Sequence, residues 1–204
     1  MAQNKDDLRV RRTRKTLQSA FIKLVSEHGF KAVTVQMLAD EAMVNRATFY
    51  RHFEDKYDLA EKAYGQIAAD YAAVIRSSKV KSGQDIYRIM FEHVALYSHF
   101  YKAMLHTMPQ IQDWIMTGTE NEIRAVAHEL EMDPDAMTIP PDIVFRYLSA
   151  ANIGVVLWWL DAGQPIPPAK MAEYIEQLHL EGGLRALKMA RFLTEFINRD
   201  AEKR

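Results

Sequence analysis

The chain has 204 residues, of which 49% are apolar and 26% charged, with a net charge of −1 and no cysteine. This composition predicts a compact globular protein with one domain or two small ones, and it excludes a disordered chain and a disulfide-stabilised one. The longest stretch without a charged residue, Tyr147 to Leu160, has 14 residues, fewer than the roughly 18 expected of a membrane span. The N-terminus is polar and basic without an apolar signal core, so we expect a cytoplasmic protein without a membrane partner.

Charge is unevenly distributed along the chain. Residues 1–64 carry 12 Lys/Arg and 9 Asp/Glu, a net charge of +3, whereas residues 65–204 carry 14 and 18, a net charge of −4. A basic N-terminal part on an acidic body fits a nucleic-acid-binding module joined to a part that avoids nucleic acid.

After a loose tail at residues 1–8, the sequence predicts a first helix that ends before Gly29. Its apolar stripe is formed by Leu17, Ala20, Phe21, Leu24 and Val25. Five cations crowd its start: Arg9, Arg11, Arg12, Arg14 and Lys15. Because cations at a helix N-terminus oppose the helix dipole, they indicate either a solvated charged turn or contact with an external anion such as phosphate. The motif that follows favours phosphate.

The stretch Thr34 to Lys56 predicts two short helices that meet at a tight turn. Thr34 and Asn45 are N-cap residues, because their side-chain oxygens can accept hydrogen bonds from first-turn amides. Met43 and Val44 form the corner between the helices. The second helix, Arg46 to Phe53, turns Phe49 and Phe53 inward and leaves its polar side chains outside. This is the pattern of a helix-turn-helix whose second helix enters the DNA major groove.

This stretch resembles the TetR (TetR/AcrR) family of one-component regulators, over roughly residues 9–64. The family pattern is matched without gaps by Gly29-Phe30, Thr34, Leu38-Ala39, Ala42, Val44, Phe49-Tyr50, His52-Phe53 and Lys56. Two positions depart from it. Met43 replaces the usual turn glycine, so the turn must either avoid positive φ or carry strain, and Asn45 replaces the usual Ser or Thr.

Candidate DNA contacts follow from the position of each side chain on the helix-turn-helix. Arg46 can donate two hydrogen bonds to guanine, and Ala47 and Thr48 offer methyl groups to thymine. For Thr34, Tyr50, His52 and Lys56, the resemblance implies phosphate contacts. The full set of expected DNA-binding residues is Thr34, Gln36, Asn45, Arg46, Ala47, Thr48, Tyr50, Arg51, His52 and Lys56. For His52, a packed or simply exposed histidine is an equal alternative, and Arg51 is either a solvated charge or an outlying phosphate contact.

Every later periodic stretch is helical, so we predict an all-α protein with a DNA-binding domain at 1–55 and an effector-binding and dimerisation domain at 56–204. A long helix begins at Asp55 or Lys56 and persists to about Arg76. Further helices are expected at 85–106, at 109–130 with a break near Gly118, at 142–162, at 169–180 and at 184–197.

The body also resembles a C-terminal ligand-sensing domain common in the same family, up to about Gly183. The resemblance implies that aromatic and methionine side chains line an apolar pocket for a small hydrophobic effector. The candidates are Phe91, Tyr97, Phe100, Tyr101, Met104, Met108, Trp114, Phe145 and Trp158. For any one of them, an ordinary core position is the commoner alternative.

Nothing in the sequence predicts an enzyme, a metal site or a cofactor. His93, His99 and His106 are spaced by 6 and 7 residues, which does not place them on one helical face. The sequence also lacks His-Glu-x-x-His, Gly-x-Ser-x-Gly and P-loop motifs.

One helix-turn-helix alone binds too little DNA for tight, specific recognition, so we expect a homodimer on a palindromic operator of double-stranded DNA. The helices at 142–162 and 169–180 are the expected dimer surface. The alternative is that they form only the intramolecular core. The most plausible function is a repressor released by the effector. The alternative is a helix-turn-helix regulator controlled by a protein partner through the terminal helix at 184–197.

Overall fold

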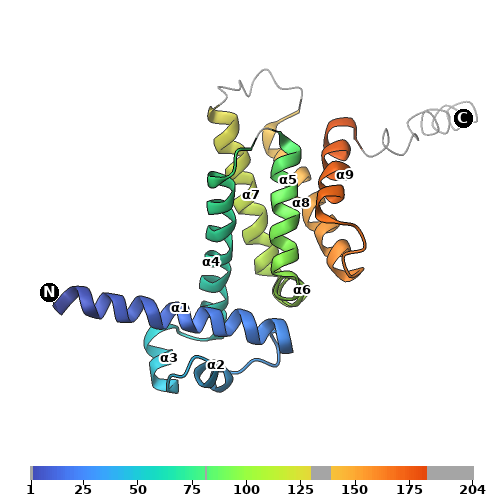
Figure 1. The fold of residues 1–204 in the computed structure, drawn as a ribbon. Coiled ribbons are helices and arrows are strands. Elements are labelled where there is room, and N and C mark those ends of the chain that lie inside the picture. Colours follow the sequence, from blue (N-terminus) through green and yellow to red (C-terminus); the bar gives the residue numbers. More distant parts are fainter. Residues whose placement is uncertain (1, 81, 130–138, 183–204) are drawn as a thin grey trace, which may run out of the picture.

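The computed structural model describes residues 2–80, 82–129 and 139–182, and all regular structure in these ranges is helical (Figure 1). The helices are α1 (Ala2–His28), α2 (Val35–Glu41), α3 (Arg46–His52), α4 (Lys56–Ser77), α5 (Gly83–Leu96), α6 (Ser98–Thr107), α7 (Pro109–Glu129), α8 (Pro141–Asp161) and α9 (Pro168–Glu181). The all-α prediction is confirmed. The helix predicted at 184–197 lies outside the described residues.

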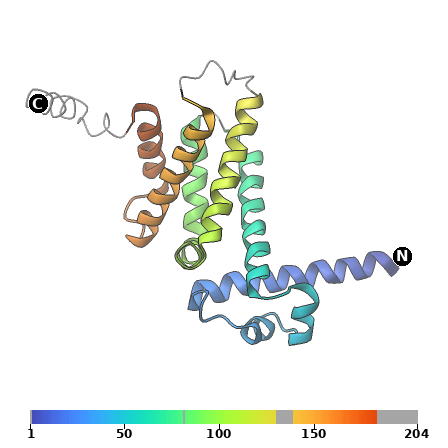
Figure 2. The same cartoon turned by 180° about the vertical axis from the view of Figure 1, so that it is seen from behind.

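A small head formed by α1, α2 and α3 lies at one end of the molecule, and α4 rises from it into the body (Figures 1 and 2). The head forms because its helices share one core: Leu17, Phe21, Val25, Leu38 and Phe49 are fully buried. Leu59, Ala60 and Ala63 on the first turns of α4 are also fully buried, so α4 completes the head before it leaves it. With 22 residues, α4 is a rod of roughly 33 Å.

Three sequence-based boundaries were wrong. Residues 2–8 are not a loose tail, because α1 already begins at Ala2. The helix expected at 85–106 is divided at Tyr97, where the backbone leaves helical geometry (φ −108°, ψ 26°). The break expected near Gly118 does not occur, since α7 continues to Glu129.

The division at Tyr97 has a packing reason. It turns α6 away from α5 so that Phe100 reaches the head and meets Phe21 edge-on, with ring centroids 6.2 Å apart. The rings of Tyr97 and Tyr101 pack against the ring of His93 on α5, with centroid distances of 5.0 and 6.1 Å. Tyr97 is neither glycine nor proline, so no local signal in the sequence marks this turn.

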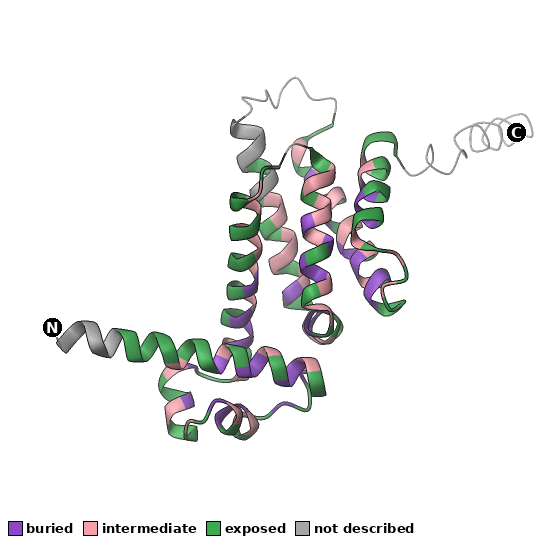
Figure 3. Cartoon of the chain, viewed as in Figure 1, coloured by how far each residue is buried: buried purple, intermediate pink, exposed green. Residues whose placement is uncertain are grey.

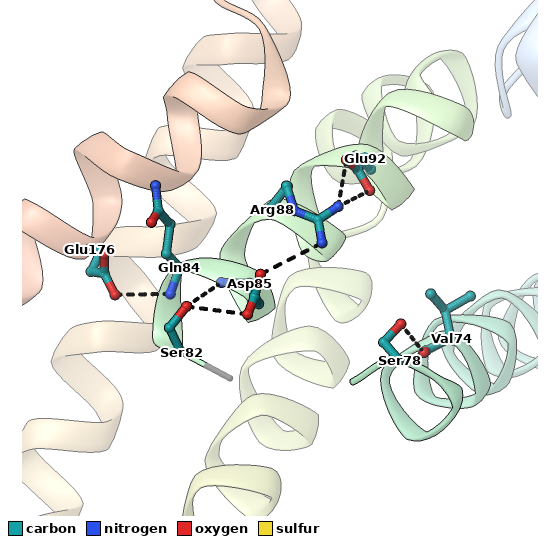
Figure 4. A network of polar contacts seen from close by, with 8 residues as sticks. All are labelled: Val74, Ser78, Ser82, Gln84, Asp85, Arg88, Glu92 and Glu176. Atoms are coloured by element: carbon teal, nitrogen blue, oxygen red, sulfur yellow. Dashed lines mark hydrogen bonds and ion pairs between the residues drawn. The ribbon is translucent and has the colours of Figure 1, made fainter. Parts of the chain in front are cut away.

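In the body, α5 packs along α9, which is distant in sequence. The start of α5 is capped twice: Ser82 Oγ accepts from Asp85 N (3.2 Å), and Glu176 Oε1 of α9 accepts from Gln84 N (2.9 Å) (Figure 4). One turn further along α9, the Tyr87 hydroxyl and His179 Nδ1 are 2.5 Å apart. These polar contacts fix the register of α9 on α5.

Helix α8 combines length with high hydropathy: an 18-residue window has a mean hydropathy of 1.5, enough by composition for a membrane span, and 33% of it is buried within the chain. It packs on α6 and α7, and the fully buried Trp159 meets Phe91 of α5 edge-on. One face of α8 is therefore core, and its apolar outer face remains to be explained.

Candidate DNA-binding site and body surfaces

The two short helices of the head are held by side-chain caps. Thr34 Oγ1 accepts from Met37 N at 3.2 Å and starts α2, and Asn45 Oδ1 accepts from Thr48 N at 2.7 Å and starts α3. Both caps were predicted from the sequence and are confirmed. Phe49 and Phe53 are 0% and 3% exposed, so α3 is fixed to the head through one face and presents the other to solvent.

The turn between these helices is strained. Met43 has φ 53° and is 90% exposed. A residue with a Cβ atom is disfavoured in this left-handed region by roughly 1 kcal/mol, which is why a glycine is the usual choice at such a turn. Of the two possibilities left open by the sequence, the strained turn is the one that occurs.

The outer face of α3 carries donors that are loosely engaged with neutral neighbours on the same helix. Arg46 Nη2 lies 3.3 Å from the Tyr50 hydroxyl, and Arg51 Nη2 donates to Thr48 Oγ1 at 2.8 Å. Arg46, Ala47, Tyr50 and Arg51 are exposed. In the described part of the chain, neither guanidinium group has an ion pair with a carboxylate, so both can turn to an acceptor outside the protein by exchanging an exposed, neutral contact.

Gln36 is the one predicted contact on α2 that faces a carboxylate. It is exposed and donates to Asp40 Oδ1 at 2.8 Å. The second N–H and the carbonyl oxygen of the amide remain available for a base edge.

His52 at the end of α3 is half-buried, and its pKa is lowered by burial first and then by the charges of Arg14 and Arg51. A lowered pKa keeps the imidazole neutral near pH 7. The same observation shows that cations from α1 and α3 lie close enough to repel a third positive charge.

Lys56 at the start of α4 is turned toward the protein. Its Nζ donates to the carbonyl oxygens of Phe30 (3.2 Å) and Val33 (3.1 Å) and lies 4.6 Å from the centre of the Phe30 ring. It therefore fastens the loop between α1 and α2, immediately before the cap residue Thr34. One ammonium proton remains for an external acceptor.

Seven of the nine predicted pocket residues lie in or against one hydrophobic cluster, and only Phe145 and Trp158 lie outside it. Phe91, Phe100, Tyr101, Met104 and Met108 are buried in this cluster, and Tyr97 and Trp114 are half-buried against it. Trp114 stacks on Tyr64 of α4, with ring centroids 5.8 Å apart. Trp158 lies apart from them: it is 52% exposed and lines a surface groove of about 430 Å³ between α8 and α9.

His93 is a functional candidate that was missed by the sequence analysis. It is 9% exposed, and its Nε2 is buried without a hydrogen-bond partner in the described part of the chain. Tyr71, Tyr97 and Tyr101 surround it at centroid distances of 5.0–6.1 Å. Burial lowers the pKa of His93 and raises that of Tyr101. The burial could not be anticipated because it depends on how α4 and α6 meet α5.

The outer faces of α8 and α9 carry a continuous apolar stripe. On α8, Ile143, Tyr147, Ala150, Gly154 and Trp158 recur at helical spacing and are all exposed. On α9, Tyr174 and Leu178 are exposed beside the groove that Trp158 lines. A second groove of about 510 Å³ follows the first turns of α8, lined by Asp142, Ile143, Arg146, Tyr147 and Ala150. Large exposed apolar patches of this kind mark interaction surfaces.

Within the described ranges, no cluster of three or more His, Asp or Glu side chains could hold a metal ion. The donors gathered on α3 and the apolar stripe on α8 and α9 are surfaces suited to partners.

Family models match both parts of the chain. Residues 19–63 match the model of bacterial regulatory proteins of the tetR family, and residues 81–180 match a transcriptional regulator C-terminal region. Two similar proteins are uncharacterised HTH-type transcriptional regulators of Bacillus subtilis (strain 168). YxbF is 26% identical over 185 residues, covering 86% of this chain and 47% of YxbF, and YvkB is 22% identical over 195 residues, covering 85% and 98%. The chain thus spans about half the length of YxbF.

Solved structures share the fold. A TetR transcriptional regulator from Streptococcus agalactiae 2603V superposes with a TM-score of 0.66 at 20% identity, covering 88% of this chain and 99% of that one. FadR from Bacillus subtilis, in complex with stearoyl-CoA, gives 0.60 at 13% identity, covering 82% and 98%. The dihydroxyacetone kinase operon activator DhaS gives 0.62 at 19% identity, covering 82% and 94%.

Proposed function

The chain belongs to the TetR family of bacterial transcriptional regulators, and from this we propose that it is a dimeric repressor released from a palindromic operator by a small hydrophobic effector. As a member of this family it is a regulator with a DNA-binding helix-turn-helix and not an enzyme. The observation that carries the proposal is the pairing of a donor-bearing α3 in the head with an unpartnered apolar stripe on α8 and α9.

In the proposed complex, α3 lies in the major groove. Arg46 reads guanine through two hydrogen bonds, while Ala47 and Thr48 meet thymine methyl groups. Gln36 reaches the same groove from α2. The remaining predicted residues contact phosphates: Thr34, Asn45, Tyr50, Arg51, His52 and Lys56. The neutral His52 then acts as a hydrogen-bond donor, and Lys56 acts mainly by holding the loop that positions Thr34.

Dimerisation through α8 and α9 is supported by the stripe from Ile143 to Trp158. Small residues at Ala150 and Gly154 permit close approach of a partner helix: a Cβ atom added at Gly154 would meet nothing within 4 Å. Two copies that cross on this stripe would bury both surface grooves. Burial in a dimer also accounts for the hydropathy of α8 without a membrane.

The proposed effector site lies where the body meets α4. Tyr64 and Tyr71 of α4 face Trp114 and His93, and both α4 and α6 pack on α1. An apolar molecule inserted among these rings would displace α4, α6 or both, and hence the head. To be effective, it must favour the displaced state by about 1–3 kcal/mol. The FadR structure, which is in complex with stearoyl-CoA, supports an effector with a long apolar chain for this fold.

Repression is the proposed sign of regulation because occupancy of an operator is sufficient to block transcription, whereas activation needs a further surface for polymerase. DhaS, an operon activator, has the same fold, so the sign requires its own test. Deleting the gene should raise transcripts downstream of the operator. A fall in those transcripts would show activation instead.

The test of DNA recognition is in vitro selection from a random duplex library with the full chain, followed by affinity measurements on the selected duplex. Arg46→Ala should lose about 1–3 kcal/mol of binding free energy and relax selection at one base pair per half-site. Asp113→Ala, on the body, is the matched control and should bind as wild type. Failure to enrich any sequence would overturn the proposal.

A further inference from the structure

The N-terminal part of α1 extends far beyond the core of the head. Leu17 is the first fully buried residue of this helix, and the preceding side chains from Leu8 onward are exposed, apart from the half-buried Thr13 (Figure 3). We call residues 2–16 the α1 overhang. At 1.5 Å per residue it is roughly 22 Å long. This length is about that of six base pairs of B-DNA, at 3.4 Å along one strand per base pair.

The α1 overhang is strongly basic: residues 2–16 carry six Lys/Arg and two Asp, a net charge of +4. From Leu8 to Ser26 the sequence has six Lys/Arg and no Asp or Glu. Among the described residues from Leu8 onward, no carboxylate pairs with Arg9, Arg12 or Arg14, whereas Lys23, further along α1, pairs with Glu41 at 2.8 Å. Like charges three or four positions apart, such as Arg9 and Arg12, destabilise a helix by about 0.2–0.5 kcal/mol per pair.

The positive charge of the α1 overhang is continuous with that of α3. Arg14 lies close enough to His52 for its charge to act on that imidazole, together with Arg51 of α3. Because α1 packs on α3, a cation from each helix acts on the imidazole at the end of α3. Such a surface is complementary to a run of phosphates, which bear one negative charge per nucleotide.

The direction of the α1 overhang decides which phosphates it can reach. The start of α1 projects on the side of the head that carries α3, whereas α8 and α9 lie on the opposite side of the molecule, as both views agree (Figures 1 and 2). In a dimer through α8 and α9, the two overhangs would point away from the two-fold axis. They would then lie over DNA outside the two segments that the α3 helices read.

We propose that the α1 overhang is a second DNA-binding element, which contacts phosphates flanking each half-site independently of base sequence. The proposal rests on the proposed function, since it requires that α3 enter the major groove. It goes beyond that function by assigning a site outside the helix-turn-helix. Because phosphate contacts carry no base information, the element lengthens the operator without lengthening its sequence motif.

The test compares a core duplex, which ends at the outer edge of the selected motif, with an extended duplex that has eight more base pairs of arbitrary sequence at each end. Wild type should bind the extended duplex at least ten-fold more tightly in about 0.1 M salt. Arg9→Gln/Arg12→Gln should bind both duplexes with nearly equal affinity. On the extended duplex, its plot of log K against log salt should flatten by about 0.9 per lost contact, or about 1.8 per head.

The matched control is Arg76→Gln/Lys79→Gln, which removes the same charge from exposed positions at the far end of α4. This control variant should keep the full gain in affinity when the duplex is extended. Equal gains for wild type and Arg9→Gln/Arg12→Gln would overturn the α1 overhang as a DNA-binding element while leaving the proposed function intact. Failure of wild type to select any duplex would instead overturn the proposed function.

Discussion

The head and the body each present a stable surface to a partner, but one surface is polar and the other is apolar. The head exposes polar side chains on a helix of seven residues, which is held by caps, by Phe49 and Phe53, and by the two hydrogen bonds of Lys56. The body exposes apolar side chains on α8, a helix of 21 residues whose other face is core. Side-chain hydrogen bonds and a small core therefore position the DNA-binding surface, whereas the packing of long helices positions the proposed dimer surface.

The largest effect is expected from a variant that disrupts the apolar surface of the body and leaves the head intact. Tyr147→Glu/Leu178→Glu places charges on the apolar stripe of α8 and α9, where burial in a dimer would leave them unpaired. The dimer should become a monomer by analytical ultracentrifugation, with at least a hundred-fold loss of operator affinity. Leu96→Glu, at an apolar position 74% exposed elsewhere on the body, is the control and should remain dimeric. A dimeric double variant would contradict the proposed interface.

Lys56→Met tests whether the head depends on internal hydrogen bonds. The substitution keeps the apolar stem but leaves the carbonyl oxygens of Phe30 and Val33 without their donor. Two lost bonds should lower the free energy of unfolding by about 1–3 kcal/mol, measured by urea denaturation. Operator affinity should fall by a similar factor at low and high salt, because the defect is one of positioning. If affinity falls mainly at low salt, the phosphate contact of Lys56 outweighs its positioning role.

Asn45→Ala removes the cap of α3 and should cost about 1 kcal/mol of stability, measured in the same way. Asn45→Asp keeps an acceptor for Thr48 N and should retain the stability, although its negative charge should weaken DNA binding. Equal stability of Asn45→Ala and wild type would show that α3 is held by its apolar face alone.

Met43→Gly should have a smaller effect of opposite sign. Glycine adopts the positive φ of this turn without strain, while its greater freedom in the unfolded chain offsets part of the gain. We expect a rise in unfolding free energy of up to about 1 kcal/mol. A loss of stability would mean that the exposed Met43 side chain makes a contact that outweighs the strain.

The smallest expected effect is a pH dependence of the stability, which arises from His93 in the body. Because burial lowers the pKa of His93, its folded-state pKa lies below the unfolded value of about 6.5. The unfolded chain then binds protons first, so stability should decrease as pH falls below about 6.5. His93→Phe should reduce this decrease when urea denaturation is repeated at pH 7.5 and pH 5.5. His179, whose pKa burial also lowers, should account for part of the remainder.

The same contrast explains what the sequence could reveal. The caps at Thr34 and Asn45, the inward Phe49 and Phe53 and the start of α4 at Lys56 depend on neighbours within four residues, so they were predicted correctly. The turn at Tyr97, the surface position of Trp158 and the burial of His93 depend on how separate helices meet. Periodicity shows which face of a helix is apolar, but not which other helix packs on that face. Lys56 is intermediate: its importance was predicted, but its bonds to residues 30 and 33 were not.

The central claim is that α8 and α9 hold two α3 helices at a fixed spacing. Its most direct test is the affinity for the selected duplex after five base pairs are inserted between the half-sites. Since 10–10.5 base pairs make one turn, the insertion moves one half-site to the opposite side of the DNA. We predict at least a hundred-fold loss of affinity. Unchanged affinity would show that each head binds independently and would contradict the claim.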